Sequence, residues 1–548
     1  MKKKITRIYK KEKTKVQKRT ILLIILLISI IMALHFGNFT RANEIKEISY
    51  INYYTTDNFD DKIKIQEDEE GKYISLPEEV NNKKVSEFYI YDNTEINYKP
   101  KDKYYITDDI DKLSFLVIYQ EENEQNELSL IQEQSEETNV TNLVYVGECG
   151  QEGEEGNETN PYKTFERAVS EINSNEGTII VKGTLNLTSW YADAKKNLTI
   201  QGYNQNSKIL INGDLTLQGN TYFKDITFMI PASSTYRTIY ANGYNLTIGE
   251  EKKNTNVKVI SEDGKYPYIY GGSNSRDITG NTNIIINSGS FQSVYGGSKS
   301  KNITGDTNLT IKYATIINSV YGGSYGATIN GNTNINIYGG IYGTGIQDAT
   351  VMSVAGGSDN TGVIKKNSNL YVENAKIVNG SIGGAGTTST VENTVNTIIK
   401  NISLGLNNDG TNSIYGAAYR GGNTGSKQVN FEVDNIKGKP EYIIGYSNIS
   451  GGAASGTVRM NLKNINSENT QIYGGSYKCT ATNNVSLVAN MENVKVKLLS
   501  AGGSVQNKIY KYDISINNGC KFYDSLYLGI STEKQTNVAT SSNVLKVT

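Results

Sequence analysis

The chain contains very little histidine, tryptophan, cysteine and proline. Of its 548 residues, one is His, one Trp, three Cys and six Pro. The only histidine, His35, lies in an apolar N-terminal stretch, so the rest of the chain has no imidazole to act as a general base or metal ligand. The cysteines, Cys149, Cys479 and Cys520, form no paired zinc motif. Either Cys479 and Cys520 form a bridge between neighbouring repeats, or the thiols are free and buried.

Long apolar runs are also scarce. The one candidate, Ile21–Leu34, has 14 residues and follows a head rich in lysine and arginine. A run of this length is short for a bilayer span and fits the core of a signal peptide, and Thr40-Arg41-Ala42 is an acceptable cleavage site. Residues 1–42 are therefore predicted to be a signal peptide or a retained signal anchor. The protein is expected to be secreted or displayed on the cell surface, touching a membrane only through this segment.

The charge balance excludes one class of partner. Eleven of the 55 Lys and Arg residues and one of the 56 acidic residues precede residue 43, so the remainder carries a net charge of about −11. This mildly acidic surface has no basic patch for nucleic acid and does not favour anionic polysaccharides.

Composition divides the remaining chain. Residues 43–118 contain a single glycine, Gly71, and runs such as "KYISLP", "EFYIYD" and "LSFLVIYQ" that predict a small β domain. Residues 119–142 are rich in Glu, Gln and Asn and are predicted to be an acidic linker.

Glycine and tyrosine are abundant from residue 143 onward, and they recur together. Between Tyr270 and Ile341 three near-copies of one unit begin "YGGSNSRDITGNTN", "YGGSKSKNITGDTN" and "YGGSYGATINGNTN". The first Gly of the recurring Gly-Gly pair falls at 271, 296, 322, 356, 383, 451, 474 and 502, with a Gly-Ala version at 416. Spacings of 25 and 26 residues that later lengthen indicate a solenoid with loops of varying length.

The pattern within each unit predicts strands. In "NTNIIINSG", "DTNLTIKYA" and "NTNINIYGG", apolar residues alternate with Asn and Thr, and no helical spacing is seen nearby. Short strands joined by Gly, Asn and Ser turns would stack into a parallel β-helix over residues 143–548. A kelch propeller also uses Gly-Gly after an apolar run, but its blades need about 50 residues.

The start of this region carries a family resemblance. The sequence predicts three elements in order: a strand, a helix from Lys163 to about Ile172 with one apolar face, and the strand Thr178–Gly183. The matching residues are Pro161, Lys163, Thr164, Phe165, Ala168, Val169, Gly177, Thr178 and Ile179. They resemble the beginning of the right-handed parallel β-helix of the pectin-lyase-like superfamily, where such a helix caps the end of the solenoid. The resemblance covers about 144–548 and implies an all-β fold with an N-terminal capping helix.

The catalytic motifs of that family are not matched. Its hydrolases use clustered aspartates with Gly-His-Gly and Arg-Ile-Lys segments, and its lyases use calcium-binding aspartates and an arginine base. Asp277 and Asp306 occupy corresponding turns, but the third copy has Asn330 near that position, so they are interpreted as solvated turn residues. "GGSNSRDIT" departs from the calcium-binding nonapeptide repeat. No metal site, catalytic residue or cofactor is predicted.

The tyrosines before the Gly-Gly pairs are the candidate binding residues. Tyr270, Tyr295, Tyr321 and Tyr473 share one position in "YGGS" and are predicted to form a row. The preceding β-branched residues, such as Val294, are expected to face the core, which would leave the row exposed or half-exposed. It is either a stacking column that stabilises a corner or a set of sugar-stacking platforms.

These features predict an exported surface protein with an adhesin-like or envelope-structural role and no catalysis. Its expected partners are glycans, cell-wall polymers or host matrix proteins. The alternative is a polysaccharide lyase or glycoside hydrolase with an atypical carboxylate or Tyr/Lys site.

Overall fold

The computed structural model describes part of the chain. It describes the strands between residues 48 and 119, and most of residues 142–548. The exceptions within 142–548 are residues 152–154, 252–255, 347–350, 406–411, 422–427, 448, 451–454, 480–483, 504–508 and 529–543. The predicted export segment 1–42 and residues 120–141 of the predicted linker lie outside the described residues. The chain divides into two compact units, residues 1–136 and 137–548.

The first unit is an antiparallel β domain. One sheet has the order β1-β8-β5-β4, with β6 also on β5, and a second has the order β2-β3-β7. The runs that predicted strands from sequence correspond to β3, β5 and β8. The bounds are β1 Ile48–Tyr54, β2 Gln66–Asp68, β3 Gly71–Ser75, β4 Glu79–Val80, β5 Lys83–Ile90, β6 Asn93–Tyr98, β7 Lys103–Tyr105 and β8 Lys112–Tyr119.

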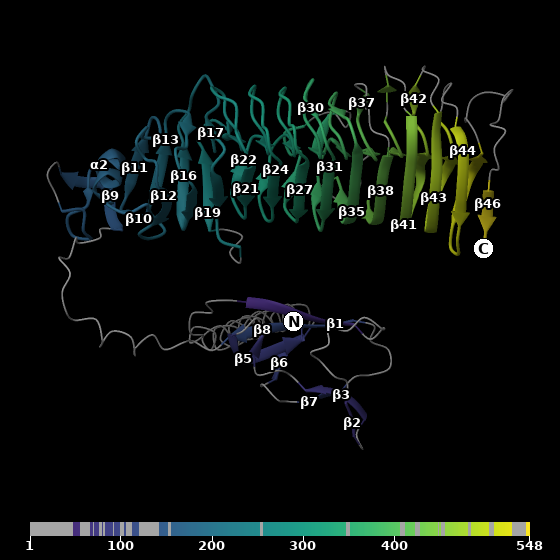
Figure 1. The fold of residues 1–548 in the computed structure, drawn as a ribbon, viewed down its shortest axis with the longest axis horizontal. Coiled ribbons are helices and arrows are strands. Elements are labelled where there is room, and N and C mark those ends of the chain that lie inside the picture. Colours follow the sequence, from purple (N-terminus) through teal and green to yellow (C-terminus); the bar gives the residue numbers. More distant parts are fainter. Residues whose placement is uncertain are drawn as a thin grey trace, which may run out of the picture. The chain divides into compact units, whose positions relative to one another are not determined.

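The second unit is a parallel β-helix, as predicted, and its strands follow one another in a row from β9 to β46 (Figure 1). Three sets of strands stack in register. The first set is β14 Leu215–Thr216, β17 Thr238–Tyr240, β20 Tyr268–Tyr270, β23 Val294–Tyr295, β26 Val320–Tyr321, β29 Met352–Ala355, β33 Ser381–Gly383, β36 Ile414–Tyr415 and β39 Tyr442–Ile444.

The second set carries the alternating Asn/Thr pattern and is the longest. It comprises β9 Leu143–Gln151, β10 Glu176–Val181, β12 Asn197–Gly202, β15 Thr221–Lys224, β18 Asn245–Ile248, β21 Thr282–Ile286, β24 Thr307–Ile311, β27 Thr333–Tyr338, β31 Ser368–Glu373, β35 Thr394–Leu404, β38 Gln428–Lys437, β41 Ser455–Tyr473, β43 Asn484–Ser500, β44 Ile509–Ile516 and β46 Val544–Val547. β41 and β43 continue around the corner and pair with β39 and β45.

The third set and the loop strands complete the turns. The third set comprises β11 Thr184–Leu187, β13 Lys208–Ile211, β16 Ile226–Ile230, β19 Val257–Ser261, β22 Ser290–Phe291, β25 Thr315–Ile316, β28 Ile341–Tyr342, β32 Lys376–Ile377 and β45 Lys521–Tyr527. Short strands in the loops are β30 Val363–Ile364, β34 Thr390–Val391, β37 Arg420–Gly421, β40 Ile449–Ser450 and β42 Lys478–Cys479. β30, β37 and β42 lie along one edge of the β-helix (Figure 1).

A short helix, α2 (Phe165–Glu171), lies at the first turns, as predicted. Thr164 caps its N-terminus, and Phe165, Ala168 and Val169 are buried. At its other end, Lys196 donates to the carbonyl oxygens of Val169 and Ile172. The helix thus covers apolar core at the end of the solenoid and leaves none of these carbonyls unpaired.

The core follows the period-2 pattern of the second set. In β24 the burial alternates strictly, with Leu309 and Ile311 inside. The loops add another inner column, in which Ile278, Ile303, Ile329 and Ile364 pair in succession and are each at most 2 % exposed. Stacking identical positions in this way buries apolar area in every rung without a wide core.

The Gly-Gly turns are required for steric reasons. A Cβ on Gly296 would lie 2.3 Å from the backbone oxygen of Gly322, and one on Gly322 would lie 2.2 Å from that of Gly356. The column continues through Gly384, Gly416, Gly445 and Gly474. Gly445, in "IIGYSN", therefore occupies the position in the glycine column that the sequence analysis assigned to the Gly-Gly pair at 451. That pair lies outside the described residues.

Hydroxyl and amide side chains lock these turns to their neighbours. The buried hydroxyls of Thr282 and Thr307 donate to the carbonyls of Gly296 and Gly322, each at 2.6 Å. On the second set, side-chain amides form an outer ladder with N···O distances of 2.6–2.9 Å, through Asn245, Asn283, Asn308, Asn334, Asn369, Asn396 and Asn430.

The predicted alternative of a Cys479–Cys520 bridge is wrong, because Cys520 carries a free thiol. Cys479 lies on β42, in a small sheet with β37 and β40, whereas Cys520 precedes β45 of the main sheet. Within the described residues, none of the helices has the length and apolar content needed to span a membrane.

Candidate functional site

The tyrosines before the Gly-Gly turns form a stack, as predicted. Backbone register aligns Tyr240, Tyr270, Tyr295 and Tyr321 on successive strands of the first set. Their ring centroids are 5.5, 4.6 and 5.2 Å apart, with interplanar angles of 20°, 6° and 13°. We call these four residues the tyrosine stack.

The predicted exposure of the row is wrong. Tyr270 and Tyr295 are 5 % exposed, Tyr321 is 3 % and Tyr473 is 2 % exposed. The strand alternation itself holds, because Val294 belongs to the main core and Tyr295 to a separate apolar cluster. The side of the strand opposite the core is not exposed to solvent, however, because Tyr270 and Tyr321 cover the two faces of the Tyr295 ring.

Side chains from later loops cover the outer side of the stack. Tyr325 meets Tyr295 edge-on at 6.2 Å, and Asp359 and Thr387 reach the hydroxyls of Tyr295 and Tyr321. Each lies a few residues after a Gly-rich turn. A strand pattern gives no information about loops that fold back over it, so this second layer was not predictable from alternation.

Tyr473 does not belong to the stack. The register that begins at Tyr321 continues through Ala355, Gly383, Tyr415 and Ile444 before it reaches Tyr473. Tyr473 instead packs with Tyr442 and Tyr477, with centroids 6.3 and 4.9 Å away. The shared "YGGS" motif therefore predicted the register of Tyr473 but not its neighbours.

A cavity lies next to the point where the column changes from Tyr321 to Ala355 and Gly383. We call this cavity, of about 650 Å³, the tyrosine pocket. Met352 fills part of the vacated space, since a Cβ on Gly383 would lie 2.6 Å from its Cε. The lining residues are Tyr268, Ser293, Tyr295, Asn318, Ser319, Tyr321, Tyr325, Gly345, Ile346, Val351, Met352, Asp359, Thr387 and Tyr419. Tyr325 and Val351, each 43 % exposed, border it on the solvent side.

A hydrogen-bond network anchors the carboxylate of Asp359, the one acid among the described lining residues. The Tyr295 hydroxyl donates to Oδ2 of Asp359 at 3.2 Å, and the Thr387 hydroxyl donates to Oδ1 at 3.2 Å. The Tyr321 and Thr387 hydroxyls lie 3.1 Å apart. The backbone N–H of Asp359 also donates to the carbonyl of Ser324, which fixes the loop. The carboxylate is thus held in place by groups from three rungs.

The phenols in this network stay neutral over the physiological range. Burial, and then the negative charge of Asp359, raise the pKa of Tyr295 and Tyr321 well above the ordinary phenol value. Burial also raises the pKa of Tyr270 and Tyr415. These hydroxyls can donate hydrogen bonds but cannot serve as bases near neutral pH.

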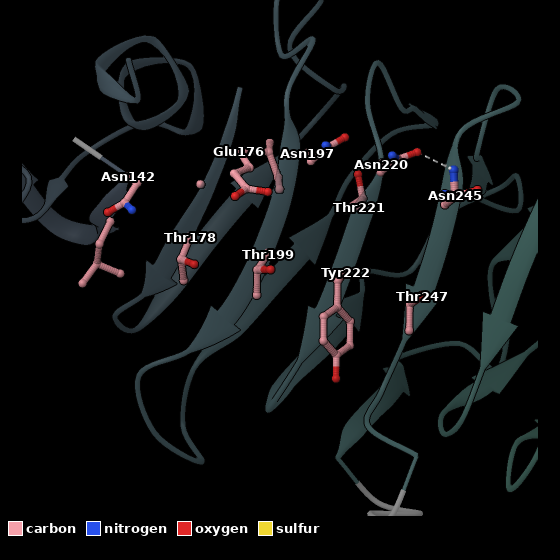
Figure 2. A pocket seen from close by; sticks show the side chains of 13 residues that line it. Asn142, Glu176, Thr178, Asn197, Thr199, Asn220, Thr221, Tyr222, Asn245 and Thr247 are labelled. Atoms are coloured by element: carbon pink, nitrogen blue, oxygen red, sulfur yellow. Dashed lines mark hydrogen bonds between the residues drawn. The ribbon is translucent and has the colours of Figure 1, made fainter. Parts of the chain in front are cut away.

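A second depression, of about 490 Å³, lies on the face of β9, β10, β12, β15 and β18 (Figure 2). Thr178, Thr199, Tyr222 and Thr247 come from four consecutive strands in register, and their side chains lie along this face. Glu176 is the only acid among the described residues that line it. This face is the regular outer surface of the sheet.

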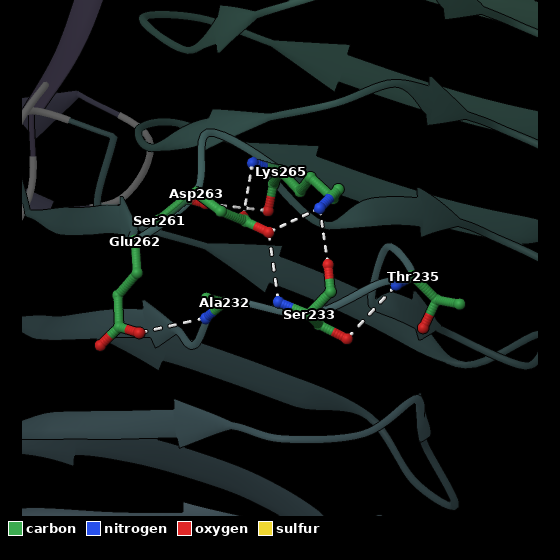
Figure 3. Close-up of polar contacts among 7 residues, drawn as sticks. All are labelled: Ala232, Ser233, Thr235, Ser261, Glu262, Asp263 and Lys265. Carbon is green, nitrogen blue, oxygen red and sulfur yellow. Dashed lines mark hydrogen bonds and ion pairs between the residues drawn. The ribbon is translucent and has the colours of Figure 1, made fainter.

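A polar cluster joins two loops farther along (Figure 3). Asp263 accepts hydrogen bonds from the Lys265 ammonium at 2.7 Å and the Ser233 amide at 3.1 Å. Lys265 Nζ also donates to the Ser233 carbonyl at 2.6 Å. The hydrogen bond from Lys265 holds the pKa of the Asp263 carboxyl well below its usual range. Because these polar groups satisfy one another, the cluster connects successive loops and is a structural feature.

The acids lie in turns, as interpreted from sequence, but their predicted correspondence is wrong. Ile278 pairs with Ile303 and Thr282 with Thr307, so Asp277 is equivalent to Asn302 and Asp306 to Asn281. Asp277 is exposed and accepts a hydrogen bond from the backbone N–H of Asn302 at 2.9 Å, and Asp306 accepts one from the backbone N–H of Asn332 at 2.7 Å. Each carboxylate therefore links one turn to the next rung. In the part of the chain that the structure describes, no three His, Cys, Asp or Glu side chains are grouped closely enough to hold a metal ion.

Three residues of the site were missed from the sequence. Tyr240 lies in "TIYANG", a variant of the "YIYGGS" unit, and the likeness of these segments could have identified it. Asp359 and Thr387 follow Gly-Gly turns in loops of irregular length, and no sequence signal marks them. No known family model, no curated protein and no solved structure matches this chain.

Proposed function

We propose that this protein is an exported, non-catalytic binding protein with an adhesin-like role, and that it engages its partner at the tyrosine pocket. The observation that carries the proposal is the cavity of about 650 Å³ beside the end of the tyrosine stack, with aromatic walls and one anchored carboxylate. Cavities of this size and composition are typical of small-ligand sites. A residue of a wall polymer or a glycan would fit there.

Part of this proposal is that the β-helix belongs to a non-catalytic branch of the pectin-lyase-like superfamily, right-handed like its members. The order of α2 (Phe165–Glu171) and β10 (Glu176–Val181), together with the asparagine ladder, supports it. A parallel crossover is right-handed in almost all known sheets.

The alternative of a lyase or hydrolase has less support in the pocket. Glycoside hydrolysis uses two carboxyl groups on either side of the scissile bond. Asp359 is the only acid among the lining residues that the structure describes, and two hydroxyls already donate to it. A tyrosine base would need a lowered pKa, whereas burial and Asp359 raise that of Tyr295 and Tyr321.

A binding screen with matched variants tests the proposal. The purified protein would be screened against neutral and amino-sugar glycans, bacterial wall polymers and matrix proteins, with release of sugar and of unsaturated ends measured in parallel. We expect at least one probe to bind, Asp359→Asn with Tyr325→Ala to weaken it at least tenfold, and Asp193→Asn with Tyr313→Ala to leave it unchanged. Failure to bind any probe, binding equal in both double variants, or turnover of a polymer would overturn the proposal.

A further inference from the structure

We infer that the tyrosine pocket recognises an organic cation, an alkylated ammonium group carried by its ligand. This inference rests on the proposed binding function and adds the chemistry that the site selects. It follows from the charge of the lining, from the balance of donors and acceptors, and from the aromatic walls.

The described residues of the lining carry one charge. Among them, Asp359 is the only ionisable side chain other than the tyrosines. Among the described residues, no lysine or arginine lies within ion-pair distance of it. Both of its hydrogen bonds from the lining come from neutral hydroxyls, Tyr295 and Thr387. The described part of the pocket therefore presents a negative charge without a counter-charge, and an incoming cation would supply one.

The hydroxyl donors next to Asp359 are already used. The hydroxyls of Tyr295 and Thr387 donate to Asp359, and the Ser319 hydroxyl donates to the Met352 carbonyl at 2.7 Å. A carboxylate offers about four acceptor positions, and these two hydroxyls occupy two. Around Asp359 the pocket thus has spare acceptor positions, while the neighbouring hydroxyls of Tyr295, Tyr321 and Thr387 are engaged. A ligand that brings N–H or polarised C–H groups suits it better than one that brings lone pairs.

The rest of the wall is aromatic and apolar. Tyr268, Tyr325 and Tyr419 line the cavity together with Ile346 and Val351. Aromatic rings attract cations through their negative faces, and several tyrosines around one site are a known way of binding quaternary ammonium groups. The aliphatic side chains would contact the alkyl substituents. A free metal ion would find a single carboxylate among the described lining residues, whereas calcium sites commonly use several carboxylate oxygens.

Choline and its uncharged isostere, 3,3-dimethylbutan-1-ol, distinguish charge from shape. Binding to the full chain would be measured by titration calorimetry and by the ring resonances of ¹³C-labelled tyrosine. We expect choline to bind and the isostere to bind at least tenfold more weakly. The affinity for choline should fall at least tenfold in Asp359→Asn and at least threefold in Tyr325→Leu. It should not change in the distant controls Asp193→Asn and Tyr313→Leu. The melting temperatures of all four variants would show that each is folded.

Each outcome is informative. Equal binding of choline and the isostere, or choline binding that persists in Asp359→Asn, would overturn the cation inference. No choline binding, with a glycan or wall polymer still bound in an Asp359-dependent manner, would overturn the cation inference and leave the proposed function standing. No binding of any probe would remove both.

Discussion

The phenol of Tyr295 donates a hydrogen bond to the carboxylate of Asp359, which lies 64 positions farther along the chain and 3.2 Å away. Tyr295 lies on β23, and Asp359 follows β29, two strands further along the same stacked set. One contact therefore ties the buried stack to the loop that lines the tyrosine pocket. Stability and binding should both depend on it, and they can be separated by mutation.

Truncation of the stack should be costly. Tyr295→Ala removes a ring that contacts Tyr270 and Tyr321 on its two faces, and we expect a loss of about 3–5 kcal/mol in unfolding free energy. Tyr295→Phe keeps the ring and loses the hydrogen bond to Asp359, which should cost about 1–3 kcal/mol. Denaturant unfolding measures both. Tyr313→Ala, at a residue 50 % exposed, is the control and should change stability by only a few tenths of a kcal/mol. Equal effects at 295 and 313 would show that the stack is not packed as described.

The glycine column should not tolerate a methyl group. Gly296→Ala places Cβ 2.3 Å from the Gly322 oxygen, so the rungs must separate locally, at a cost of about 1–3 kcal/mol or more. Gly326→Ala meets nothing within 4 Å and should be neutral or slightly stabilising. Thermal melts of the pair decide this, and a Gly296→Ala variant as stable as Gly326→Ala would contradict the turn geometry.

The asparagine ladder should require amides. Asn334 donates to Asn308 at 2.9 Å and accepts from Asn369 at 2.7 Å. Asn334→Asp loses the donor and places a carboxylate against the Asn308 oxygen, and we expect a loss of about 1–2 kcal/mol at neutral pH. In Asn274→Asp the only side-chain contact, the hydroxyl of Ser300, can still donate to the new carboxylate, so stability should hardly change. Chemical denaturation of both proteins compares them, and equal stabilities would contradict the ladder.

Stability should fall at alkaline pH. Burial raises the pKa of Tyr270, Tyr295, Tyr321 and Tyr342 in the folded state, whereas unfolded tyrosine ionises near pH 10. The stabilising contribution is thus complete below about pH 10 and is lost above it, by about 1.4 kcal/mol per pH unit for each such tyrosine. Tyrosinate absorbance and the β-sheet circular dichroism signal should change together as the protein unfolds. Ionisation of all tyrosines near pH 10 with the fold intact would contradict this burial.

The sequence predicted the repeating parts of this protein well because each rung obeys the same local rules. Leu309 and Ile311 alternate with Thr310, and the "YGGS" motif set the register of Tyr270, Tyr295 and Tyr321 correctly. What repeats at a fixed position can be inferred from a single unit.

The parts that break the repeat could not be predicted. Tyr321 gives way to Ala355 only after a loop of irregular length, and Asp359 approaches Tyr295 only because the chain has wound through two further strands of the set. The exposure of the tyrosines was misjudged for the same reason, since loops distant in sequence supply the covering layer. Such contacts depend on how far each loop extends, which composition and spacing do not determine.

The location of binding is the most direct test of the proposed function. Ring-labelled tyrosine resonances, assigned by single substitutions, would be followed while the full chain is titrated with choline and, separately, with purified wall polymer. If the tyrosine pocket is the site, the resonances of Tyr325 and Tyr419 shift in a saturable manner, while those of Tyr203 and Tyr313, exposed elsewhere on the β-helix, stay in place. Shifts confined to Tyr203 and Tyr313, or no saturable shift with either probe, would contradict it.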